Sequence, residues 1–349
     1  MNEVGPRLYD DLIDLIALER WMDNAGLGTG TIGGVTTLSG GTQNILIRFA
    51  RDERDFILRR PPIHSGPTHD DSIRREAKVL TALASSDVPH PRVIASCDDR
   101  EILGTAFYLM EPIDGFNPAD GLPAEFTEDA DAQASMSLSL VDALATLSQI
   151  DPFDVGLATP DRARGWCERQ VVRWITQLNS YEQFRGWPGG EIANLGELQH
   201  RLSEQSGVHF QPGFVHGDYH VANVMFRYDR PEVAAIVDWE LATFGDPLLD
   251  LGHLLATWPR ATGRSSAATV LDLPGFVSGE SLVERYVQRS SRRVDDLDWY
   301  YSLACLRLGV LLEGTYARAC AGLVAIDVGL HFHDMTVSLF EQGLHRFDW

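Results

Sequence analysis

The hydrophobic pattern changes near Gly115, and this change constrains the fold more than any other feature of the 349 residues. Before it, β-branched and aromatic residues alternate with polar ones along 35–60, 92–97 and 106–113, which is typical of strands. After it, apolar residues recur at helical spacing in five stretches, 134–150, 165–181, 192–205, 281–291 and 296–340. The sequence therefore predicts an α+β protein, with an antiparallel sheet lobe (1–112) followed by a larger, mainly helical lobe (113–349).

Two helices are expected within the sheet lobe. Leu8, Leu12, Leu15 and Ile16 fall at helical spacing in the first twenty residues. The stretch "HDDSIRREAKVLTALAS" begins with acidic residues and keeps its apolar residues on one face, so it predicts the main helix of this lobe. Glycine pairs and the segment "RDERD" supply turns between the first strands.

Composition excludes several classes of partner. The chain has 29 basic and 50 acidic residues, a formal charge of −21. Such a field repels nucleic acid and anionic membranes, which leaves small molecules as the expected partners. The amino-terminal sequence has no basic region followed by an apolar one, and the four cysteines form no CxxC pair. We expect a cytoplasmic protein with reduced thiols; its oligomeric state is left open.

The segment "FVHGDYHVANVMF" (214–226) carries the most specific chemistry. His216, Asp218 and Asn223 have the spacing of a kinase-type catalytic loop, and Asp238 follows at the end of the apolar run "AAIVDWE". A carboxylate at Asp218 can accept the proton of an attacking hydroxyl. The amide oxygen of Asn223 and the carboxylate of Asp238 are hard ligands of the kind that Mg²⁺ prefers.

The same residues could also have structural roles or bind zinc. A histidine two residues before an aspartate is common and usually structural. His216 and His220 are four residues apart, as in a helical zinc pair, but Gly217 and the strand-like flanks argue against a helix. We therefore expect His216 to brace the loop through hydrogen bonds and leave His220 without a role.

The joined motifs resemble a known family. "VHGDYHVANVMF" with "IVDWELATFGDPLLDLGHL" is similar to the aminoglycoside phosphotransferase and choline kinase family, in the branch related to the kinase-like domain of acyl-CoA dehydrogenase fusion proteins. The resemblance covers nearly the whole chain and implies a bilobed protein-kinase-like fold. By position it makes Asp218 the catalytic base, with His216 beside it, Asn223 and Asp238 the magnesium ligands, and Asp250 a structural acid.

The resemblance also implies a nucleotide pocket in the sheet lobe. Arg59 stands where such kinases carry a lysine that contacts phosphates, and Glu76 is its expected ion-pair partner. Arginine is not an equivalent replacement for lysine, which puts the nucleotide geometry in question. The remaining expected contacts with nucleotide are a turn over the phosphates and a hinge beside the base: Ser39, Gly40, Gly41, Thr42, Met110, Glu111 and Ile113.

These residues together predict a Mg²⁺-dependent phosphotransferase that moves the γ-phosphate of ATP, or of GTP, to a hydroxyl of a small molecule, an antibiotic or a metabolite. The alternative is a catalytically silent nucleotide- or ligand-binding module of the same fold. The acceptor is expected to bind the helical lobe near Asp218 and the loops at 155–190 and 255–280. Trp166, Trp174 and Trp187 are either walls of that site or core. Arginines there favour an anionic acceptor, whereas the net charge favours a cationic one.

Overall fold

The computed structural model describes residues 12–38, 44–62, 67–153, 165–204, 208–259 and 269–345. The chain forms two compact units. The first unit contains Met1–Gly115 together with the later segment Ala234–Glu240, and the second contains Phe116–Val233 and Leu241–Trp349. Each unit is described separately below.

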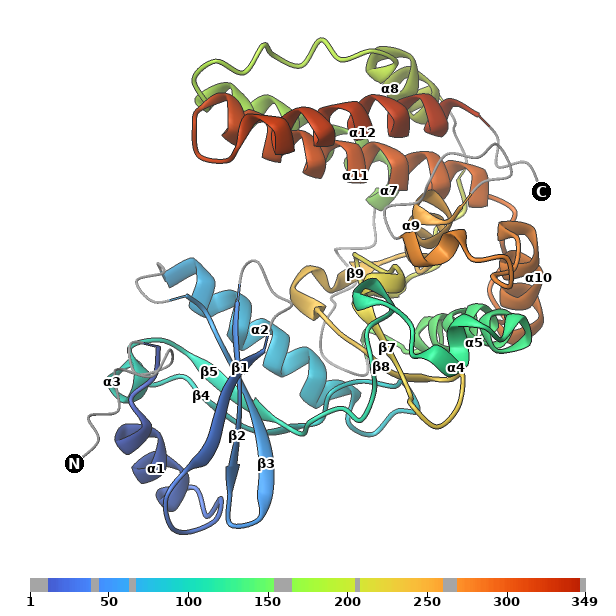
Figure 1. Ribbon diagram of the computed structural model, residues 1–349. Helices are drawn as coiled ribbons and strands as arrows, with labels where there is room; N and C mark the ends of the chain where they lie inside the picture. The colour runs from blue at the N-terminus through green and yellow to red at the C-terminus, as the bar shows by residue number, and fades with distance from the viewer. Residues whose placement is uncertain are drawn as a thin grey trace. The chain divides into compact units, whose positions relative to one another are not determined.

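A five-stranded antiparallel sheet forms the first unit (Figure 1). Its strand order is β1-β2-β3-β5-β4, with β1 Gly33–Leu38, β2 Ile45–Arg51, β3 Arg54–Arg60, β4 Val93–Cys97 and β5 Phe107–Met110. The β2–β3 hairpin turns at Asp52 and Glu53, which have φ of 54° and 60°. Two successive positive φ angles match the turn type whose twist suits a two-residue hairpin.

Helices cover both faces of this sheet. The first unit has α1 Leu15–Asn24, α2 Pro67–Leu83 and α3 Arg100–Leu103. On one face, Leu18 and Met22 of α1 pack with Phe49, Leu58 and Leu109 in a buried cluster. Side chains alternate across a strand, so Arg59 and Tyr108 point to the other face, where α2 lies. The expected main helix at 69–85 thus reaches the polar side chains of β3.

The second unit is mainly helical. Its helices are α4 Ala124–Thr127, α5 Ala130–Ser148, α7 Trp166–Asn179, α8 Leu195–Glu204, α9 Leu248–Thr257, α10 Gly279–Arg289, α11 Leu297–Cys320 and α12 Ile326–Leu344. Short strands accompany them: β6 Gly213–Val215, β7 Val224–Phe226, β8 Val233–Ile236, most of which belongs to the first unit, and β9 Thr243–Gly245. Strands β6 and β9 pair antiparallel. The predicted order, an antiparallel sheet followed by a mainly helical part, is confirmed.

Helix α11 is the centre of packing in the second unit. It runs beside α12 (Figure 1), where Ser302 Oγ donates to the Gly343 carbonyl over 2.7 Å. It also packs against α9 at Gly252, where a Cβ would lie 2.8 Å from the Tyr300 carbonyl oxygen. Only glycine allows this approach, which brings the polar residues of α9 against α11. None of the described helices is long and apolar enough to cross a membrane.

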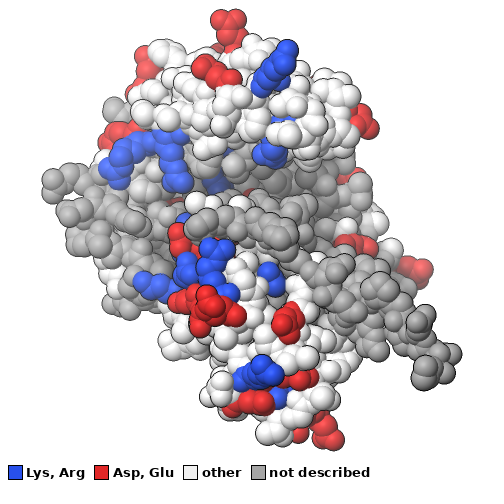
Figure 2. Space-filling model, turned by 90° about the vertical axis from the view of Figure 1, so that its left-hand side faces the viewer, with Lys and Arg blue, Asp and Glu red and all other residues white. Residues whose placement is uncertain are grey.

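The net charge of −21 does not make every face of the protein uniformly acidic. On the face drawn in Figure 2, basic and acidic side chains of the described residues lie interspersed. In the second unit, Arg285 pairs with Asp142 over 2.7 Å, and both side chains are partly exposed. Ion pairs near the surface contribute little to stability, about 0–1 kcal/mol each.

Candidate active site

The loop after β6 is held by a buried carboxylate. The backbone N–H groups of His216 and Gly217 donate to the two oxygens of Asp250 on α9, over 2.6 and 2.8 Å. Gly217 has φ of 87°, and a Cβ there would lie 2.5 Å from the Leu241 carbonyl oxygen, so the position requires glycine. Burial raises the pKa of Asp250 to about 7, against the two N–H donors. The loop and α9 thus form one rigid support for Asp218.

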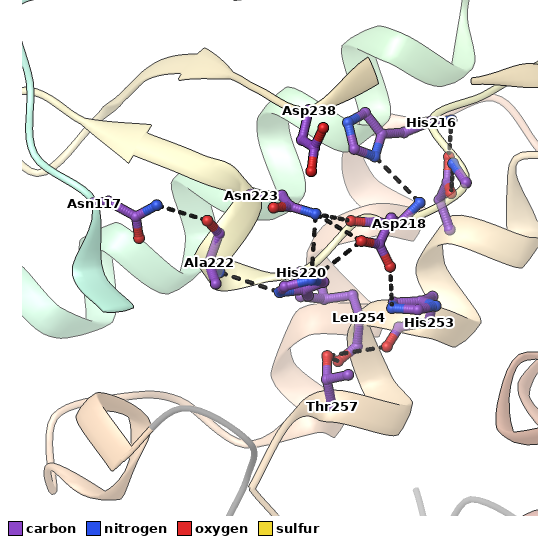
Figure 3. A network of polar contacts seen from close by, with 12 residues as sticks. Asn117, His216, Asp218, His220, Ala222, Asn223, Asp238, His253, Leu254 and Thr257 are labelled. Atoms are coloured by element: carbon purple, nitrogen blue, oxygen red, sulfur yellow. Dashed lines mark hydrogen bonds and ion pairs between the residues drawn. The ribbon is translucent and has the colours of Figure 1, made fainter. Parts of the chain in front are cut away.

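Asp218 and Asn223 are joined by two hydrogen bonds (Figure 3). The Asn223 amide nitrogen donates to the Asp218 carbonyl oxygen and to Asp218 Oδ2, both over 2.9 Å. Because both partners are acceptors, the amide NH₂ must face Asp218. The Asn223 amide oxygen therefore points away from Asp218, and it is the atom that can ligate a cation.

Three histidines surround Asp218. His216 Nδ1 accepts from the Asp218 backbone N–H over 3.2 Å, which agrees with the expected brace. His220 Nδ1 accepts from the Ala222 backbone N–H over 3.2 Å, so the proton of a neutral ring is on Nε2. This Nε2 lies 3.5 Å from Asp218 Oδ2 and 3.3 Å from the Asn223 amide nitrogen, whose two hydrogens are directed to Asp218. On the other side, His253 Nε2 of α9 lies 3.3 Å from Asp218 Oδ1.

A metal ion at this cluster is disfavoured by the tautomer. Ligand atoms of Asp218, His220 and His253 lie within 4.8 Å of one another, close enough to share an ion. However, a histidine that ligates through Nε2 normally donates from Nδ1, whereas His220 Nδ1 is an acceptor. His220 is better described as a donor that fixes one carboxylate oxygen of Asp218. The sequence left His220 without a role, and the structure places its ring against Asp218, Asn223 and Ala222.

The electrostatic surroundings keep Asp218 ionised. Burial would raise its pKa, but the His220 hydrogen bond and the positive charge of Arg307 on α11 outweigh burial and hold the pKa of Asp218 below its ordinary value. Burial lowers the pKa of His253 to about 3, so this imidazole is neutral at physiological pH. Asp218 is therefore a carboxylate beside a neutral ring, and it can accept a hydrogen bond from a hydroxyl.

In the first unit, Arg59 is paired with two carboxylates. Its Nε donates to Glu76 Oε2 over 2.8 Å and its Nη2 to Asp238 Oδ1 over 2.9 Å. Burial would lower the pKa of Arg59, but Glu76 and Asp238 raise it above its ordinary value. Glu76 Oε1 also accepts the Trp239 backbone N–H over 3.2 Å. The ion pair between Arg59 and Glu76 that the sequence suggested is present.

Asp238 occupies an unusual backbone conformation. Its φ is 64°, in the left-handed region that residues other than glycine seldom adopt, although aspartate tolerates it better than most. It follows β8, and its side chain is 39% exposed. Strained residues of this kind concentrate at functional sites. Asp238 Oδ1 is bonded to Arg59, which leaves Oδ2 as its atom for a cation.

The expected hinge residues follow β5 in the first unit. Met110 ends the strand and is partly buried. The Glu111 backbone N–H donates to the Arg92 carbonyl over 2.9 Å, so the Glu111 carbonyl is the group left for a nucleotide base. Ile113 lies two residues further along the chain. The expected phosphate turn, Ser39 to Thr42, lies outside the described residues.

The predicted site residues are divided between the units. Arg59, Glu76 and Asp238 are brought together in the first unit, and His216, Asp218 and Asn223 in the second. The expected acceptor loops fall partly outside the described residues. The three tryptophans proposed as walls are at most 9% exposed, so they belong to the core.

Two buried polar residues near Asp218 were missed by the sequence reasoning. His253 lies in the apolar run "LLDLGHLLATW" and Arg307 in "YSLACLRLGVLL". The only indication in the sequence is a polar residue within an apolar helical segment. It does not say which site the residue faces, because that depends on how α9 and α11 pack.

Comparison with known proteins identifies the family. Residues 34–286 match the model of the phosphotransferase enzyme family (APH). The chain belongs to this family. It is 27% identical over 318 residues to acyl-CoA dehydrogenase family member 11 of Gallus gallus, covering 89% of this chain and 40% of that protein. It is 26% identical over 343 residues to family member 10 of Mus musculus, covering 93% of this chain and 30% of that protein. The resemblance inferred from the motifs is confirmed.

Solved structures of the family share the fold. A putative aminoglycoside phosphotransferase from Ralstonia eutropha superposes with a TM-score of 0.74 at 26% identity, covering 95% of this chain and 98% of that one. Macrolide 2'-phosphotransferase MphH from Brachybacterium faecium gives 0.56 at 19% identity, covering 93% and 98%. Aminoglycoside phosphotransferase APH(4)-Ia, in complex with ADP and hygromycin B, gives 0.56 at 15%, covering 94% and 99%. The predicted kinase-like α+β fold is therefore confirmed.

Proposed function

We propose that the protein is a Mg²⁺-dependent phosphotransferase that transfers the γ-phosphoryl group of ATP, or of GTP, to a hydroxyl of a small molecule. The observation that carries the proposal is the double hydrogen bond from the Asn223 amide to Asp218. It fixes a carboxylate for the hydroxyl and an amide oxygen for the cation on one short loop. Membership of a phosphotransferase family supports the same reaction.

Asp218 would align the acceptor hydroxyl. A carboxylate whose pKa lies below the ordinary value is a weak base, so it orients the hydroxyl first and receives its proton as the oxygen–phosphorus bond forms. The bond between the γ-phosphorus and the bridging oxygen breaks, and ADP leaves. His220 and Asn223 hold the carboxylate in place for this step.

The donor set of the chain fits a magnesium ion. The Asn223 amide oxygen and the Asp238 carboxylate are hard oxygen ligands, as this cation requires. When bound with nucleotide, Mg²⁺ neutralises phosphate charge. Arg59 would contact the phosphates while Glu76 keeps it in position, and the Glu111 carbonyl and Ile113 N–H would bind the base.

A screen for ATP consumption tests the proposal. Purified protein with Mg²⁺ is offered aminoglycosides, macrolides, amino alcohols, sugars and hydroxy acids, and phosphorylated products are identified by mass spectrometry. Asp218→Asn should retain the fold but lower turnover by roughly 10²–10⁴-fold. Asp229→Asn changes an exposed aspartate of the same unit and should retain wild-type turnover.

Two results would count against the proposal. Full turnover in Asp218→Asn would show that this residue has been given the wrong role. Nucleotide binding without transfer to any acceptor would favour the silent binding module instead.

A further inference from the structure

Arg307 is a buried cation whose Nη1 has no hydrogen-bond acceptor among the residues that the structure describes. It lies on α11 with 5% of its surface exposed. Its guanidinium carbon stands 5.2 Å from the centre of the Trp174 ring. Among the described residues, its Nη1 has no hydrogen-bond partner, and no carboxylate oxygen lies within 4.0 Å of its nitrogens. The Trp174 ring packs against one face of the guanidinium, and the Nη1 donor at its edge has no acceptor among the described residues.

This arrangement is costly for the folded chain. A guanidinium has five N–H donors in a rigid fork. Leaving a buried donor unpaired costs about 1–3 kcal/mol, and more when the group is charged. Asp218 and Asp250 already accept hydrogen bonds from Asn223 and from backbone N–H groups, and no oxygen of either lies within 4.0 Å of an Arg307 nitrogen. The described residues thus provide no acceptor for Nη1, which is free to donate to a ligand.

The position of Arg307 connects it to the proposed reaction centre. Helix α11 packs tightly on α9 at Gly252, and the next residue of α9, His253, lies 3.3 Å from Asp218. Burial lowers the pKa of Arg307, and the negative charges of Asp218 and Asp250 oppose this shift. Helix α9 thus contacts the carboxylate for the hydroxyl through His253, and α11, which packs on α9, carries Arg307.

We infer that Arg307, supported by Trp174, recognises an oxyanion of the acceptor, so that the acceptor is an anionic hydroxyl compound. This inference rests on the proposed function. A planar guanidinium fork binds carboxylate or phosphate through two parallel hydrogen bonds. Hydroxy acids and hydroxyl-bearing phosphate esters have this chemistry, whereas amine-bearing acceptors would face a cation of like charge.

Arg173 provides a matched control within the same unit. Its guanidinium carbon lies 5.3 Å from the centre of the same Trp174 ring, but its side chain is exposed. Arg173→Gln therefore removes the same charge from the same aromatic neighbour. If net charge alone attracted anions, both variants would weaken their binding alike. A specific fork at Arg307 predicts that only Arg307→Gln does so.

Binding of matched probes tests the inference without relying on turnover. The carboxylate probe is 3-hydroxybutyrate, which is compared with its neutral amide and with the amine 4-amino-2-butanol. The phosphate probe is glycerol 3-phosphate, which is compared with glycerol. The affinity of each compound is measured by NMR titration. For at least one anion we expect binding about 10–100-fold tighter than for its neutral partner, the strength of hydrogen bonds to a charged group. Arg307→Gln should remove this preference, Arg307→Lys should restore part of it, and Arg173→Gln should keep it within about twofold.

Three results with the wild type would overturn the inference: equal binding of an anion and its neutral partner, tighter binding of the amine, or no binding of either anion at millimolar concentration. A preference for the anion that survives in Arg307→Gln would also overturn it. The last result would make Arg307 an internal counter-charge for Asp218 and Asp250. The wild-type comparison and Arg307→Lys decide the matter if Arg307→Gln does not fold.

The same probes separate this inference from the proposed function. Anion binding through Arg307 without ATP consumption by any probe would support the anion site and count against phosphoryl transfer. ATP consumption with glycerol and the amide, but without preference for the anions, would support transfer and overturn the anion site. The phosphate and carboxylate arms also show which oxyanion fits the fork.

Discussion

His253 should make the protein sensitive to acid. It is fully buried, and neither of its ring nitrogens has a hydrogen-bond partner in the described part of the chain, although Nε2 lies 3.3 Å from Asp218 Oδ1. Burial lowers its pKa from 6.5 to about 3. The unfolded state therefore binds a proton below pH 6.5, while the native state resists protonation until about pH 3. The contribution of His253 to stability is complete above pH 6.5 and decreases as the pH falls.

The size of the effect follows from linkage. Each pH unit between the two pKa values costs the native state about 1.4 kcal/mol. At pH 4.5 the loss is about 3 kcal/mol, a large share of the 5–15 kcal/mol that is usual for folded proteins. His253→Leu removes the titrating group and fills nearly the same volume, so this variant should lose about 3 kcal/mol less than the wild type between pH 7.5 and 4.5. It should be no less stable at pH 7.5, because no hydrogen bond is lost.

Urea denaturation at a series of pH values measures this difference. The free energies of unfolding of the wild type and His253→Leu are compared at each pH, so contributions that are common to both proteins cancel. His200→Leu, which removes an exposed histidine from α8, controls for the change in composition. Parallel loss of stability in the wild type and His253→Leu would refute the reasoning, because it would show that the buried ring does not stay neutral.

Three further changes test other parts of the structure. Gly217→Ala places a Cβ 2.5 Å from the Leu241 carbonyl oxygen at a positive φ, so it should lower the melting temperature, and unchanged melting would contradict the constraint. Glu76→Gln leaves Arg59 with one carboxylate partner and should cost about 3–5 kcal/mol in urea denaturation; a cost under 1 kcal/mol would show that the ion pair is dispensable. Asp238→Ala should abolish the Mg²⁺-dependent part of thermal stabilisation by ATP, whereas stabilisation equal to the wild type would remove Asp238 from the cation site.

The sequence predicts the fold well where local pattern and fold agree. Alternation of apolar residues over 35–60 identified the strands of the hairpin, and "RDERD" identified its turn, because both depend on nearby residues. Helical spacing over 296–340 identified the pair α11 and α12. The motif spacing also placed Asp218 and Asn223 on one loop, where they form two hydrogen bonds.

The rest of the candidate site depends on long-range packing, which the sequence does not show. His253 and Arg307 belong to apolar helices, and nothing in their own periodicity shows that α9 and α11 meet at Gly252 beside Asp218. The tautomer of His220 depends on one backbone N–H, that of Ala222, which the sequence cannot place. Tryptophans at helical spacing could equally be core or ligand wall, and their burial decides for core.

The chain returns to the first unit after about half of the second has been made, and this limits how the protein can be divided into fragments. The segment Ala234–Glu240 supplies Asp238 to Arg59, the Trp239 N–H to Glu76, and the Ile236 N–H to the Pro89 carbonyl over 2.9 Å. A fragment that ends at residue 115 would lack all three contacts. During synthesis, the first unit cannot form these three contacts until residue 240 has left the ribosome. The first unit thus completes its contacts only after part of the second unit has been synthesised.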